Sequence, residues 1–348
     1  MYWALPHLTS IFHKRRPIQL TFFVTRRCNA RCPWCFYLQG NDQPCSAGEE
    51  LRLDEIDALS RSLGRLLWLA FSGGEVFLRR DLVEIAELFH ARNRPSVMLF
   101  PTNGMMPELI ERQTRRILQR CPHSVVVVKL SLDGLGGAHD ALRDTPGCFA
   151  RTLDTYHRLR ALRRAYPRLE LGFNTVFLSG NQDQMDHIMQ FVASLEGAPA
   201  HTISLVRGDL ARHEFKAVDA SKYGEVVARL EQSLQKRSAA TYGFFGAQLK
   251  AAQDVVQRRL IHRTLRSGQR QIPCHAGRIN LVLSETGEVF PCEMRGESFG
   301  NVRDHGYDLR RVCRTLAART TLDSIRRAEF HCTHECYMKS KILFSPRV

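Results

Sequence analysis

Long hydrophobic runs are missing from this sequence. No continuous apolar segment of signal-peptide length occurs in the amino-terminal stretch MYWALPHLTSIFHKRRPIQL. No later segment approaches the roughly 18 consecutive apolar residues that a membrane-spanning helix needs. These two absences argue against export and against a membrane anchor. We therefore expect a cytoplasmic protein with no transmembrane segment.

Acidic residues are too few to balance the basic ones. The chain has 50 Lys and Arg against 35 Asp and Glu, which gives a formal net charge of +15 at pH 7. Nucleic acid, an acidic substrate or an anionic surface would attract such a charge. However, the basic residues are scattered, and no aromatic stacking motif lies among them. We therefore do not expect nucleic acid as a partner, although a nucleic-acid-modifying enzyme stays open as an alternative.

Close internal repeats and low-complexity tracts are also absent. The composition is that of an ordinary globular protein, with 44% hydrophobic and 24% charged residues. At 348 residues, the chain is long enough for one large domain and a smaller one.

Cysteines, in contrast, are abundant. The chain has 11 of them, and a disulfide framework would be unusual without an export signal, because the cytosol keeps thiols reduced. Metal or cluster ligation is therefore the leading explanation. Seven cysteines form two separated groups: Cys28, Cys32 and Cys35, then Cys274, Cys292, Cys332 and Cys336. The others stand apart: Cys45, Cys121, Cys148 and Cys313. The two groups suggest two cofactors.

Strand and helix patterns alternate about six times in the first part of the chain. The β-rich apolar runs are 18–24, 66–71, 96–102, 125–133, 169–177 and 201–206. Apolar residues at three- and four-residue spacing predict helices over 53–64, 81–93, 107–119, 149–165 and 183–195. This alternation predicts an α/β fold with a parallel sheet and right-handed crossover helices. It allows an α/β barrel, a partial barrel or a doubly wound sheet.

The pattern changes after residue 206. Residues 221–236 and 244–266 are typical of amphipathic helices, and 280–294 predicts a hairpin that turns at Thr286-Gly287. We therefore divide the chain into an amino-terminal extension, a core, a helical connector and a small cofactor-bearing extension. Their ranges are 1–17, 18–206, 207–269 and 270–348.

The first cysteine group lies directly after the first predicted strand. A loop at the carboxyl end of a parallel strand belongs to the active-site end of such a fold. Three soft thiolates on one short loop can hold three irons of a [4Fe–4S] cluster and leave the fourth iron open. A zinc knuckle is the alternative, but zinc normally takes four ligands, and the nearest further thiol, Cys45, lies in a polar loop.

The spacing CxxxCxxC of Cys28, Cys32 and Cys35, with Trp34 just before the last cysteine, resembles the hallmark of the radical S-adenosylmethionine (SAM) superfamily. The resemblance extends over about residues 18–206 and implies a partial (βα)6 TIM-like barrel. It also implies an enzyme in which the open iron chelates SAM. An electron from the cluster then produces a 5′-deoxyadenosyl radical, which abstracts hydrogen from a substrate.

Further motifs follow successive predicted strands in the order that the family shows. They are Ser72-Gly73-Gly74-Glu75, Thr102-Asn103-Gly104, Ser131-Leu132-Asp133-Gly134, Arg143 and Asn174. Each of them alone is also typical of a turn or a strand cap. Physical chemistry supports the expected roles of the glycines and of Glu75, because glycines permit a close backbone approach and a carboxylate suits an ammonium group.

The resemblance implies a role for each of these residues in holding the cofactor. Gly73, Gly74 and Glu75 would meet the amino group of SAM, Arg143 would lie near its carboxylate, and Asn174 would reach its ribose. Four further contacts are expected: Trp34, Asn103, Ser131 and Asp133. No catalytic residue is expected beyond these cofactor sites.

The second cysteine group brackets the predicted hairpin. Twelve residues separate Cys274 from Gly287, and four separate Gly287 from Cys292. This spacing resembles the CX(9–15)GX4C element of the SPASM and Twitch extensions of some radical SAM enzymes. Together with Cys332 and Cys336, it implies one auxiliary [4Fe–4S] cluster.

Two alternatives remain for this extension. Cys313 is interpreted as a small buried hydrophobe rather than as a fifth ligand. A tetrahedral zinc site is the competing interpretation of the whole group, with His275, His331 or His334 among its ligands.

These observations predict an oxidoreductase or maturase that modifies a peptide, a sugar-like molecule or another small natural product. An auxiliary cluster that accepts an electron would favour net oxidation. We expect a reductant such as flavodoxin or ferredoxin. Only 27 residues precede Cys28, which weakens the case for a peptide-binding extension ahead of the core. The non-enzymatic alternative is a cysteine-rich protein that binds zinc or a cluster.

Overall fold

The computed structural model describes most of the chain. The described residues are 7, 10, 14, 16–38, 49–197, 199–235, 247–327, 331–335, 338, 342 and 344. Cys45 and the predicted ligand Cys336 lie outside the described residues. In the described part of the chain, no helix is both long enough and apolar enough to cross a membrane.

Six parallel strands form the core of the fold. They are β1 (Gln19–Thr25), β2 (Trp68–Gly73), β3 (Val97–Thr102), β4 (Val125–Ser131), β5 (Leu169–Phe177) and β6 (Ala200–Leu205). They pair in chain order from β1 to β6, and the sheet is open, because no described pairing joins β6 to β1. The predicted α/β fold with a partial barrel is therefore confirmed.

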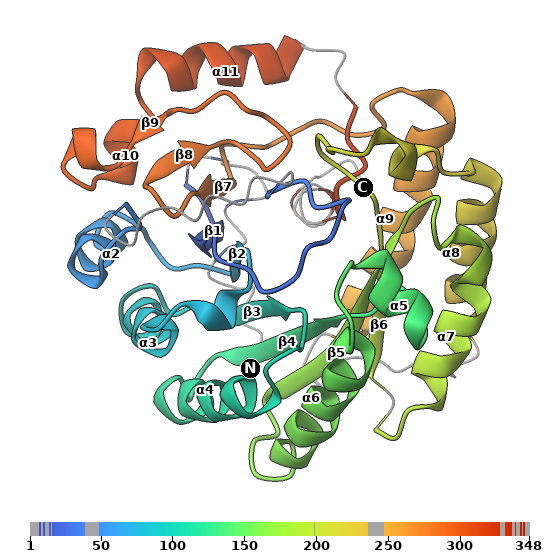
Figure 1. The fold of residues 1–348 in the computed structure, drawn as a ribbon. Coiled ribbons are helices and arrows are strands. Elements are labelled where there is room, and N and C mark those ends of the chain that lie inside the picture. The colour runs from blue at the N-terminus through green and yellow to red at the C-terminus, as the bar shows by residue number, and fades with distance from the viewer. Residues whose placement is uncertain are drawn as a thin grey trace.

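Helices follow each strand and cover the outer face of the curved sheet (Figure 1). The α-helices of the core are α2 (Leu53–Ser60), α3 (Leu82–Asn93), α4 (Pro107–Arg120), α5 (Gly137–Leu142), α6 (Cys148–Leu162) and α7 (Met185–Ser194). Short 3₁₀ helices are η2 (Val76–Leu78), η3 (Gln182–Gln184) and η4 (His213–Lys216). Only α5 has no counterpart among the helices that the sequence pattern predicted in this part of the chain.

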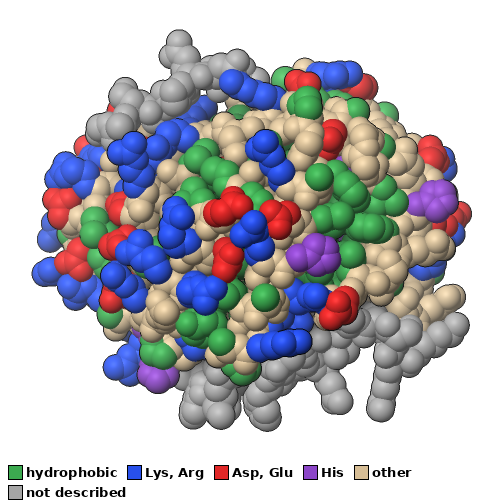
Figure 2. Space-filling model, turned by 60° about the horizontal axis from the view of Figure 1, so that its bottom comes forward, with side chains coloured by type: hydrophobic (Ala, Val, Ile, Leu, Met, Phe, Trp, Pro, Cys, Tyr) green, Lys and Arg blue, Asp and Glu red, His purple; other side chains and the backbone are tan. Residues whose placement is uncertain are grey.

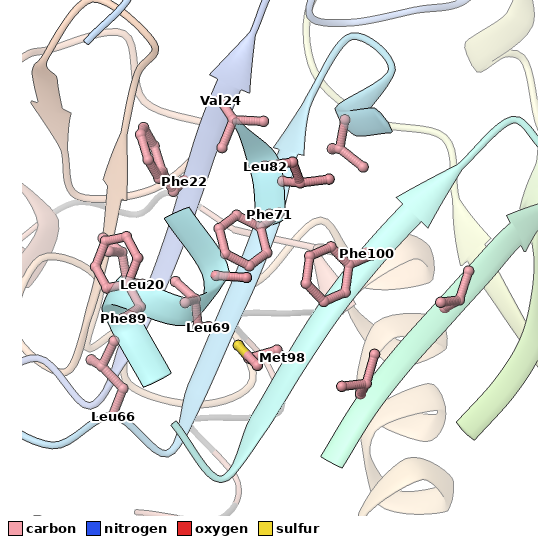
Figure 3. Packing of buried hydrophobic residues seen from close by; sticks show 14 of the residues in the cluster. Leu20, Phe22, Val24, Leu66, Leu69, Phe71, Leu82, Phe89, Met98 and Phe100 are labelled. Atoms are coloured by element: carbon pink, nitrogen blue, oxygen red, sulfur yellow. The ribbon is translucent and has the colours of Figure 1, made fainter. Parts of the chain in front are cut away.

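Alternate side chains of the strands build the main core. Successive residues of a strand point to opposite faces, so Phe22, Phe71 and Phe100 all turn toward the helices (Figure 3). The rings of Phe71 and Phe100 stack with centroids 4.7 Å apart, and Phe89 of α3 meets Phe71 edge-on at 6.5 Å. The other residues of each strand face the inside of the barrel, which leaves that side for a site.

The carboxy-terminal extension continues the same sheet. Strand β7 (Asn280–Leu283) pairs in parallel with the free edge of β1, with Gln19 opposite Asn280. Strands β8 (Glu288–Phe290) and β9 (Gly300–Asn301) then add in antiparallel fashion. The predicted hairpin at Thr286-Gly287 is confirmed, and Gly287 has the positive φ of 95° that such a turn requires. The sequence did not predict that the hairpin would extend the core sheet.

Two long helices connect core and extension. They are α8 (Ala220–Gln235) and α9 (Ala247–Ser267), which pack against each other beside β6 (Figure 1). Beyond the hairpin lie η5 (Arg303–His305), α10 (Leu309–Val312) and α11 (Leu316–Arg327). The division of the chain at residues 17, 206 and 269 stays a prediction.

Charges of both signs mix on the face that carries α4 and α6. Blue Lys and Arg side chains lie among red Asp and Glu side chains on that face (Figure 2). Many of them are paired across neighbouring helices, as in Arg116–Glu84 at 2.9 Å and Arg120–Glu87 at 2.7 Å. This mixed pattern gives no support for nucleic-acid binding there.

A buried carboxylate ties α2 to the extension. Glu55 is 4% exposed and accepts hydrogen bonds from Arg303 Nε at 2.8 Å and from the Tyr307 hydroxyl at 2.8 Å. Its carboxylate also accepts the backbone N–H of Arg52 at 2.8 Å. These hydrogen bonds, that of Arg303 first, lower the pKa of Glu55 to about 2. The contact therefore helps to hold the extension against the core.

We predict that Glu55→Gln lowers the free energy of unfolding by about 2 kcal/mol at neutral pH. The pKa of Glu55 is depressed in the folded state, so its contribution is complete above 4.5, the ordinary pKa of a glutamate, and is lost as the pH falls toward 2. Urea unfolding at several pH values measures this difference. Glu87→Gln, which removes an exposed pair, is the control and should change stability by less than about 1 kcal/mol. An equal effect of both variants would contradict the prediction.

Candidate functional site

The first cysteine group lies where the sequence predicted it. Residues 28–35 follow β1 at the carboxyl end of the parallel strands, and all three thiols are half-buried. Backbone N–H groups point at two of the sulfurs: Ala30 N lies 3.5 Å from Cys28 Sγ, and Leu38 N lies 3.4 Å from Cys35 Sγ. Amide donors of this kind are typical partners of cluster sulfurs.

Burial controls the acidity of Cys28 and Cys32. It raises the pKa of Cys28 and raises that of Cys32 to about 12. The charges of the three thiols also act on one another, so they lie near each other. Within the described residues, however, no three His, Cys, Asp or Glu side chains are gathered at metal-ligand spacing. The assignment of a cluster to Cys28, Cys32 and Cys35 therefore stays a prediction.

Gly73 and Gly74 bring the end of β2 against the end of β1. Gly74 N donates to Thr25 O at 2.8 Å, and Glu75 N donates to Arg27 O at 2.8 Å. A Cβ at Gly74 would lie 2.2 Å from Arg27 O, and one at Gly73 would lie 2.3 Å from Thr25 O. The glycines are thus required by a close approach of two backbones. The consequence is that Glu75 comes next to the cysteine loop.

Glu75 is almost fully buried beneath this loop. Its carboxylate accepts hydrogen bonds from Asn103 N at 2.8 Å, Thr102 Oγ1 at 2.9 Å and Phe77 N at 3.2 Å. Burial raises its pKa to about 7, and these hydrogen bonds oppose that rise. A carboxylate has roughly four acceptor positions, so one remains for a further donor. The charge of Glu75 also acts on Cys28, so the carboxylate lies within electrostatic range of that predicted iron ligand.

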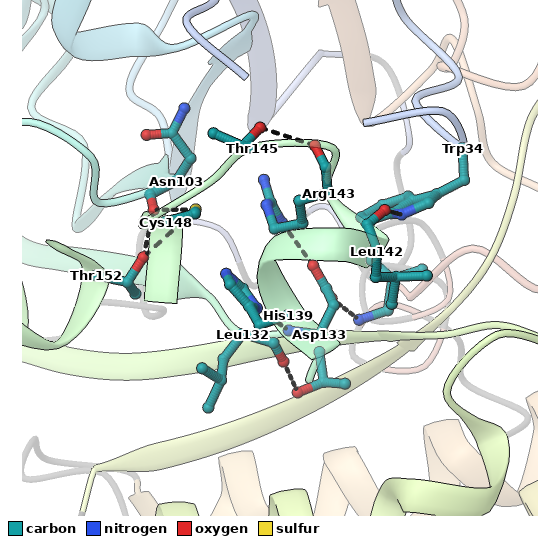
Figure 4. Close-up of polar contacts among 12 residues, drawn as sticks. Trp34, Asn103, Leu132, Asp133, His139, Leu142, Arg143, Thr145, Cys148 and Thr152 are labelled. Carbon is teal, nitrogen blue, oxygen red and sulfur yellow. Dashed lines mark hydrogen bonds and ion pairs between the residues drawn. The ribbon is translucent and has the colours of Figure 1, made fainter. Parts of the chain in front are cut away.

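Asn103 lies between Glu75 and the cysteine loop. Its Nδ2 donates to Asn29 Oδ1 at 2.7 Å and lies 4.0 Å from Cys28 Sγ. Its backbone carbonyl oxygen accepts a hydrogen bond from Thr152 Oγ1 at 2.7 Å, which fixes the segment after β3 to α6 (Figure 4). The structure therefore brings the predicted residues Glu75, Asn103 and Cys28 together.

Arg143 stands on the other side of the cysteine loop, in a buried ion pair. Its Nη1 donates to Asp133 Oδ2 at 2.5 Å, and its guanidinium lies 5.6 Å from the centre of the Trp34 ring (Figure 4). Trp34 is itself held, because its Nε1 donates to Leu142 O at 3.2 Å. Burial alone would lower the pKa of Arg143, but nearby Cys32 and Asp133 raise it overall, so it stays charged.

Asp133 is fully buried, and its carboxylate is used inside the protein. Besides Arg143, it accepts the N–H of Val176 at 2.8 Å, and its own N–H donates to His139 Nδ1 at 3.0 Å. Burial lowers the pKa of His139 to about 4, so the imidazole is neutral and can accept this bond. The Asp133 carboxylate thus holds Arg143 in place, and its contact with the cofactor stays a prediction.

One buried donor of Arg143 is left over. Its Nε has no hydrogen-bond partner among the described residues, although the side chain is only 6% exposed. A buried unpaired donor is costly and normally has a partner. Together with the open acceptor position of Glu75, it fits the carboxylate and ammonium of an amino acid, as SAM carries. The donor set therefore fits the predicted cofactor.

Ser131 and Asn174 lie side by side on β4 and β5. They are in register, and Asn174 Oδ1 accepts from Ser204 Oγ of β6 at 2.9 Å. Among the described residues, Asn174 Nδ2 has no partner, so it remains available to a hydroxyl group. The structure therefore keeps Asn174 as a candidate ribose contact, and it assigns no hydrogen bond to the Ser131 side chain.

Three thiols of the second cysteine group lie in one region, although within the described residues they too are not gathered at metal-ligand spacing. Cys292 is buried, its pKa is raised to about 12 by burial, and the charges of Cys332 and Cys274 add to that rise. Cys292 and Cys274 belong to one apolar cluster with Phe23 of β1. His334 N lies 3.3 Å from Cys332 Sγ. Three of the four predicted auxiliary thiols thus lie near each other, beside β1.

An unpredicted ion-pair network holds this second group to the core. Glu293 Oε2 lies 2.7 Å from His334 Nε2 and 3.3 Å from Arg207 Nη2, just beyond β6. Burial alone would raise the pKa of Glu293, but His334 and Arg207 lower it to about 2. His334 Nε2 is thereby engaged, which argues against that atom as a zinc ligand.

Cys313 lies apart from both groups. Its thiol packs against the main core at the end of α10, and burial raises its pKa to about 11. No charge of another thiol acts on it. The thiol is half-buried, and its interpretation as a small hydrophobe rather than a ligand stays a prediction.

The sequence analysis also missed a cation inside the barrel. Lys129 lies on β4 two residues before Ser131, and its Nζ donates to Thr202 Oγ1 of β6 at 2.9 Å. The amine passes over Gly172, where a Cβ would lie 2.6 Å from it. The signal was present, because a lysine interrupts the apolar run VVVVKLS.

Comparisons with known proteins identify the family that this chain resembles. Residues 22–192 match the family model described as "Radical SAM superfamily". The chain is 25% identical over 311 residues to the AdoMet-dependent heme synthase of Methanosarcina barkeri (strain Fusaro). That match covers 84% of this chain and 81% of the synthase. It is 26% identical over 302 residues to the antilisterial bacteriocin subtilosin biosynthesis protein AlbA of Bacillus subtilis (strain 168). That match covers 84% of this chain but only 59% of AlbA.

A solved structure shares the fold. Streptococcus suis SuiB bound to S-adenosylmethionine superposes with a TM-score of 0.63 at 14% sequence identity. The match covers 89% of this chain and 68% of SuiB. At this level of identity the likeness concerns the fold alone.

We predict that Asp133→Ala lowers the free energy of unfolding by about 3 kcal/mol, because it leaves the charge of Arg143 buried and unpaired. Urea unfolding of the cofactor-free protein measures the change. The matched control is Asp154→Ala, which removes the exposed partner of Arg158 and should cost less than about 1 kcal/mol. Equal stability of the Asp133→Ala variant and the unchanged protein would refute the proposed positioning role.

Proposed function

The chain belongs to the radical SAM superfamily of enzymes, and we propose that it uses SAM to oxidise an organic substrate by hydrogen abstraction. One observation carries the proposal. The half-buried thiols of the Cys28 loop have two charged neighbours, the buried carboxylate of Glu75 with an open acceptor position and the buried guanidinium of Arg143, whose Nε has no partner among the described residues.

Each of these residues has a distinct task. Cys28, Cys32 and Cys35 would bind three irons of a [4Fe–4S] cluster, so that the fourth iron stays open for SAM. Glu75 would accept a hydrogen bond from the ammonium of SAM, and Arg143 would donate one to its carboxylate. When bound, the cluster supplies the electron that splits SAM into methionine and a 5′-deoxyadenosyl radical.

The chain also protects the reacting atoms from water. Trp34 and Phe36 pack on an apolar cluster that contains Leu178 and Val206, at the carboxyl ends of β5 and β6. An apolar wall of this kind excludes water from a reactive intermediate. Asn174 would orient the nucleoside through its free Nδ2.

We further propose one auxiliary [4Fe–4S] cluster. Its ligands would be Cys274, Cys292, Cys332 and, outside the described residues, Cys336. The convergence of the first three supports this assignment. Such a cluster would supply a site that accepts an electron, which favours net oxidation. We expect a cytoplasmic protein that receives its electrons from a flavodoxin or ferredoxin, since both sites need reduced thiols.

A peptide is our first candidate substrate. The similarity to AlbA, a protein of bacteriocin biosynthesis, extends over 84% of this chain and supports a maturase. A tetrapyrrole is the second candidate, and the similarity to AdoMet-dependent heme synthase favours it, because that match covers 81% of the relative. Lys129 on the inner face of β4 suits a carboxylate, which either substrate can carry.

We predict that Cys32→Ala abolishes the formation of 5′-deoxyadenosine. The experiment uses anaerobically reconstituted protein with dithionite and SAM, and the product is measured by liquid chromatography. Cys121→Ala, which removes a fully buried thiol of the main core, is the control and should keep the activity. Production of 5′-deoxyadenosine by the Cys32→Ala variant would overturn the assignment of the first site.

We predict that Cys292→Ala lowers the iron content from about eight to about four atoms per chain, since each cluster holds four. Cleavage of SAM should persist, because the first cluster remains. Cys313→Ala is the matched control in the same extension and should keep about eight irons. Equal iron in both variants, or bound zinc in the unchanged protein, would argue against an auxiliary cluster.

The substrate class is tested by identifying the molecule that loses a hydrogen atom to the 5′-deoxyadenosyl radical. With dithionite and SAM, we expect deuterium to pass from a labelled peptide substrate into 5′-deoxyadenosine, as detected by mass spectrometry. Candidate peptides are those encoded next to the gene, and iron-coproporphyrin tests the second candidate. Transfer from the porphyrin and from no peptide would replace the first candidate by the second.

A further inference from the structure

A cavity of about 370 Å³ lies at the end of the molecule opposite to the cysteine loops. Its lining includes Arg16 and Pro17 just before β1, Gly64 before β2 and Arg278 before β7. These strands are parallel, so the cavity lies at their amino ends, whereas Cys28 follows the carboxyl end of β1. Strand β1 is 7 residues long, which separates the two ends by roughly 20 Å.

Basic residues far apart in the sequence converge on this cavity. Lys14, Arg16, Arg278, Arg310 and Arg314 all line it, and no Asp or Glu does. Among the described residues, the side chains of Arg16, Arg278 and Arg314 make no hydrogen bond or ion pair. Many other arginines of this protein have carboxylate partners. Among the described residues, the cavity thus gathers three guanidinium groups, those of Arg16, Arg278 and Arg314, that no carboxylate neutralises.

The remaining lining is largely apolar. Leu63, Leu281 and Leu322 contribute to it, and so does Cys313. The cavity is also too large for inorganic phosphate alone and falls within the usual size range of small-molecule sites. Apolar walls beside several guanidinium groups suit a ligand with an anionic head and an apolar body.

We propose that this cavity binds a soluble small molecule that carries a phosphomonoester group and an apolar body. A phosphomonoester is a dianion with three terminal oxygens, which can accept hydrogen bonds from several arginines at once. A carboxylate offers two oxygens and one charge. The unpartnered guanidinium groups of Arg16, Arg278 and Arg314 would hold the phosphate, and Leu281 and Leu322 would contact the body.

Calorimetric titration of the anaerobically reconstituted protein tests the proposal, with phenyl phosphate, inorganic phosphate and benzoate as probes. Phenyl phosphate should bind about tenfold more tightly than either of the others, because it alone combines the dianion with an apolar body. The double variant Arg278→Gln/Arg314→Gln should weaken its binding at least tenfold. Arg311→Gln is the matched control, since Arg311 neighbours Arg310 but faces Asp308 and does not line the cavity, and it should bind normally.

A further variant distinguishes the binding of the apolar body from that of the phosphate group. Leu322→Ser should reduce the preference for phenyl phosphate and leave the binding of inorganic phosphate unchanged. Thermal unfolding establishes that each variant is folded. Absence of saturable binding, or equal binding by the double variant, would overturn the proposal. Sedimentation of the protein with vesicles that contain phosphatidic acid would also overturn the proposal if it depended on the cavity arginines. The phosphomonoester group would then belong to a lipid rather than to a soluble molecule. None of these measurements depends on cleavage of SAM.

Discussion

The parallel pairing of β1 with β2 is the constraint on which the site depends. Beyond the regular strands, Gly74 and Glu75 continue this pairing with the backbone of Thr25 and Arg27. The two glycines permit the approach, since any side chain there would collide with a carbonyl oxygen. As a result, a buried carboxylate comes to lie beside the first cysteine of the loop. If this pairing slipped by one residue, Glu75 would turn to the opposite face of the sheet.

The other edge of β1 links the two cysteine groups. It pairs with β7, and the hairpin that follows carries Cys292 next to Phe23 of the same strand. Just beyond the end of β6, Arg207 and His334 both contact Glu293. These contacts connect the second cysteine group to the core. One strand therefore supports both predicted cluster sites. The place of the proposed auxiliary cluster beside β1 would then follow from sheet topology rather than from a separately docked domain.

Much of the fold could be predicted because periodicity is a local signal. The run 18–24 corresponds to β1, and the segment 81–93 corresponds to α3 within one residue. Helix α5 was missed, because six residues are too few to show a helical period. The partner of β7 was missed as well, because a strand's own sequence does not specify which free edge it joins.

The sequence proposes candidate ligands for the site, but it does not reveal the contacts that support them. Cysteine spacing is a local pattern, and the motifs around Glu75 and Arg143 were in the expected order. The role of Asp133 was not predictable, because it depends on complete burial beside His139 and Val176. Convergence of Arg16, Arg278 and Arg314 on one cavity was equally hidden, because Arg16 lies near the opposite end of the chain from the other two.

The central claim is that an iron held by the Cys28 loop is open to SAM. Electron paramagnetic resonance of the dithionite-reduced protein tests it most directly, with and without SAM. SAM should change the g values of one of two [4Fe–4S] signals, and Glu75→Gln should raise the SAM concentration needed for that change. If SAM left every cluster signal unchanged in the unaltered protein, the open iron, and with it this account of the site, would be contradicted.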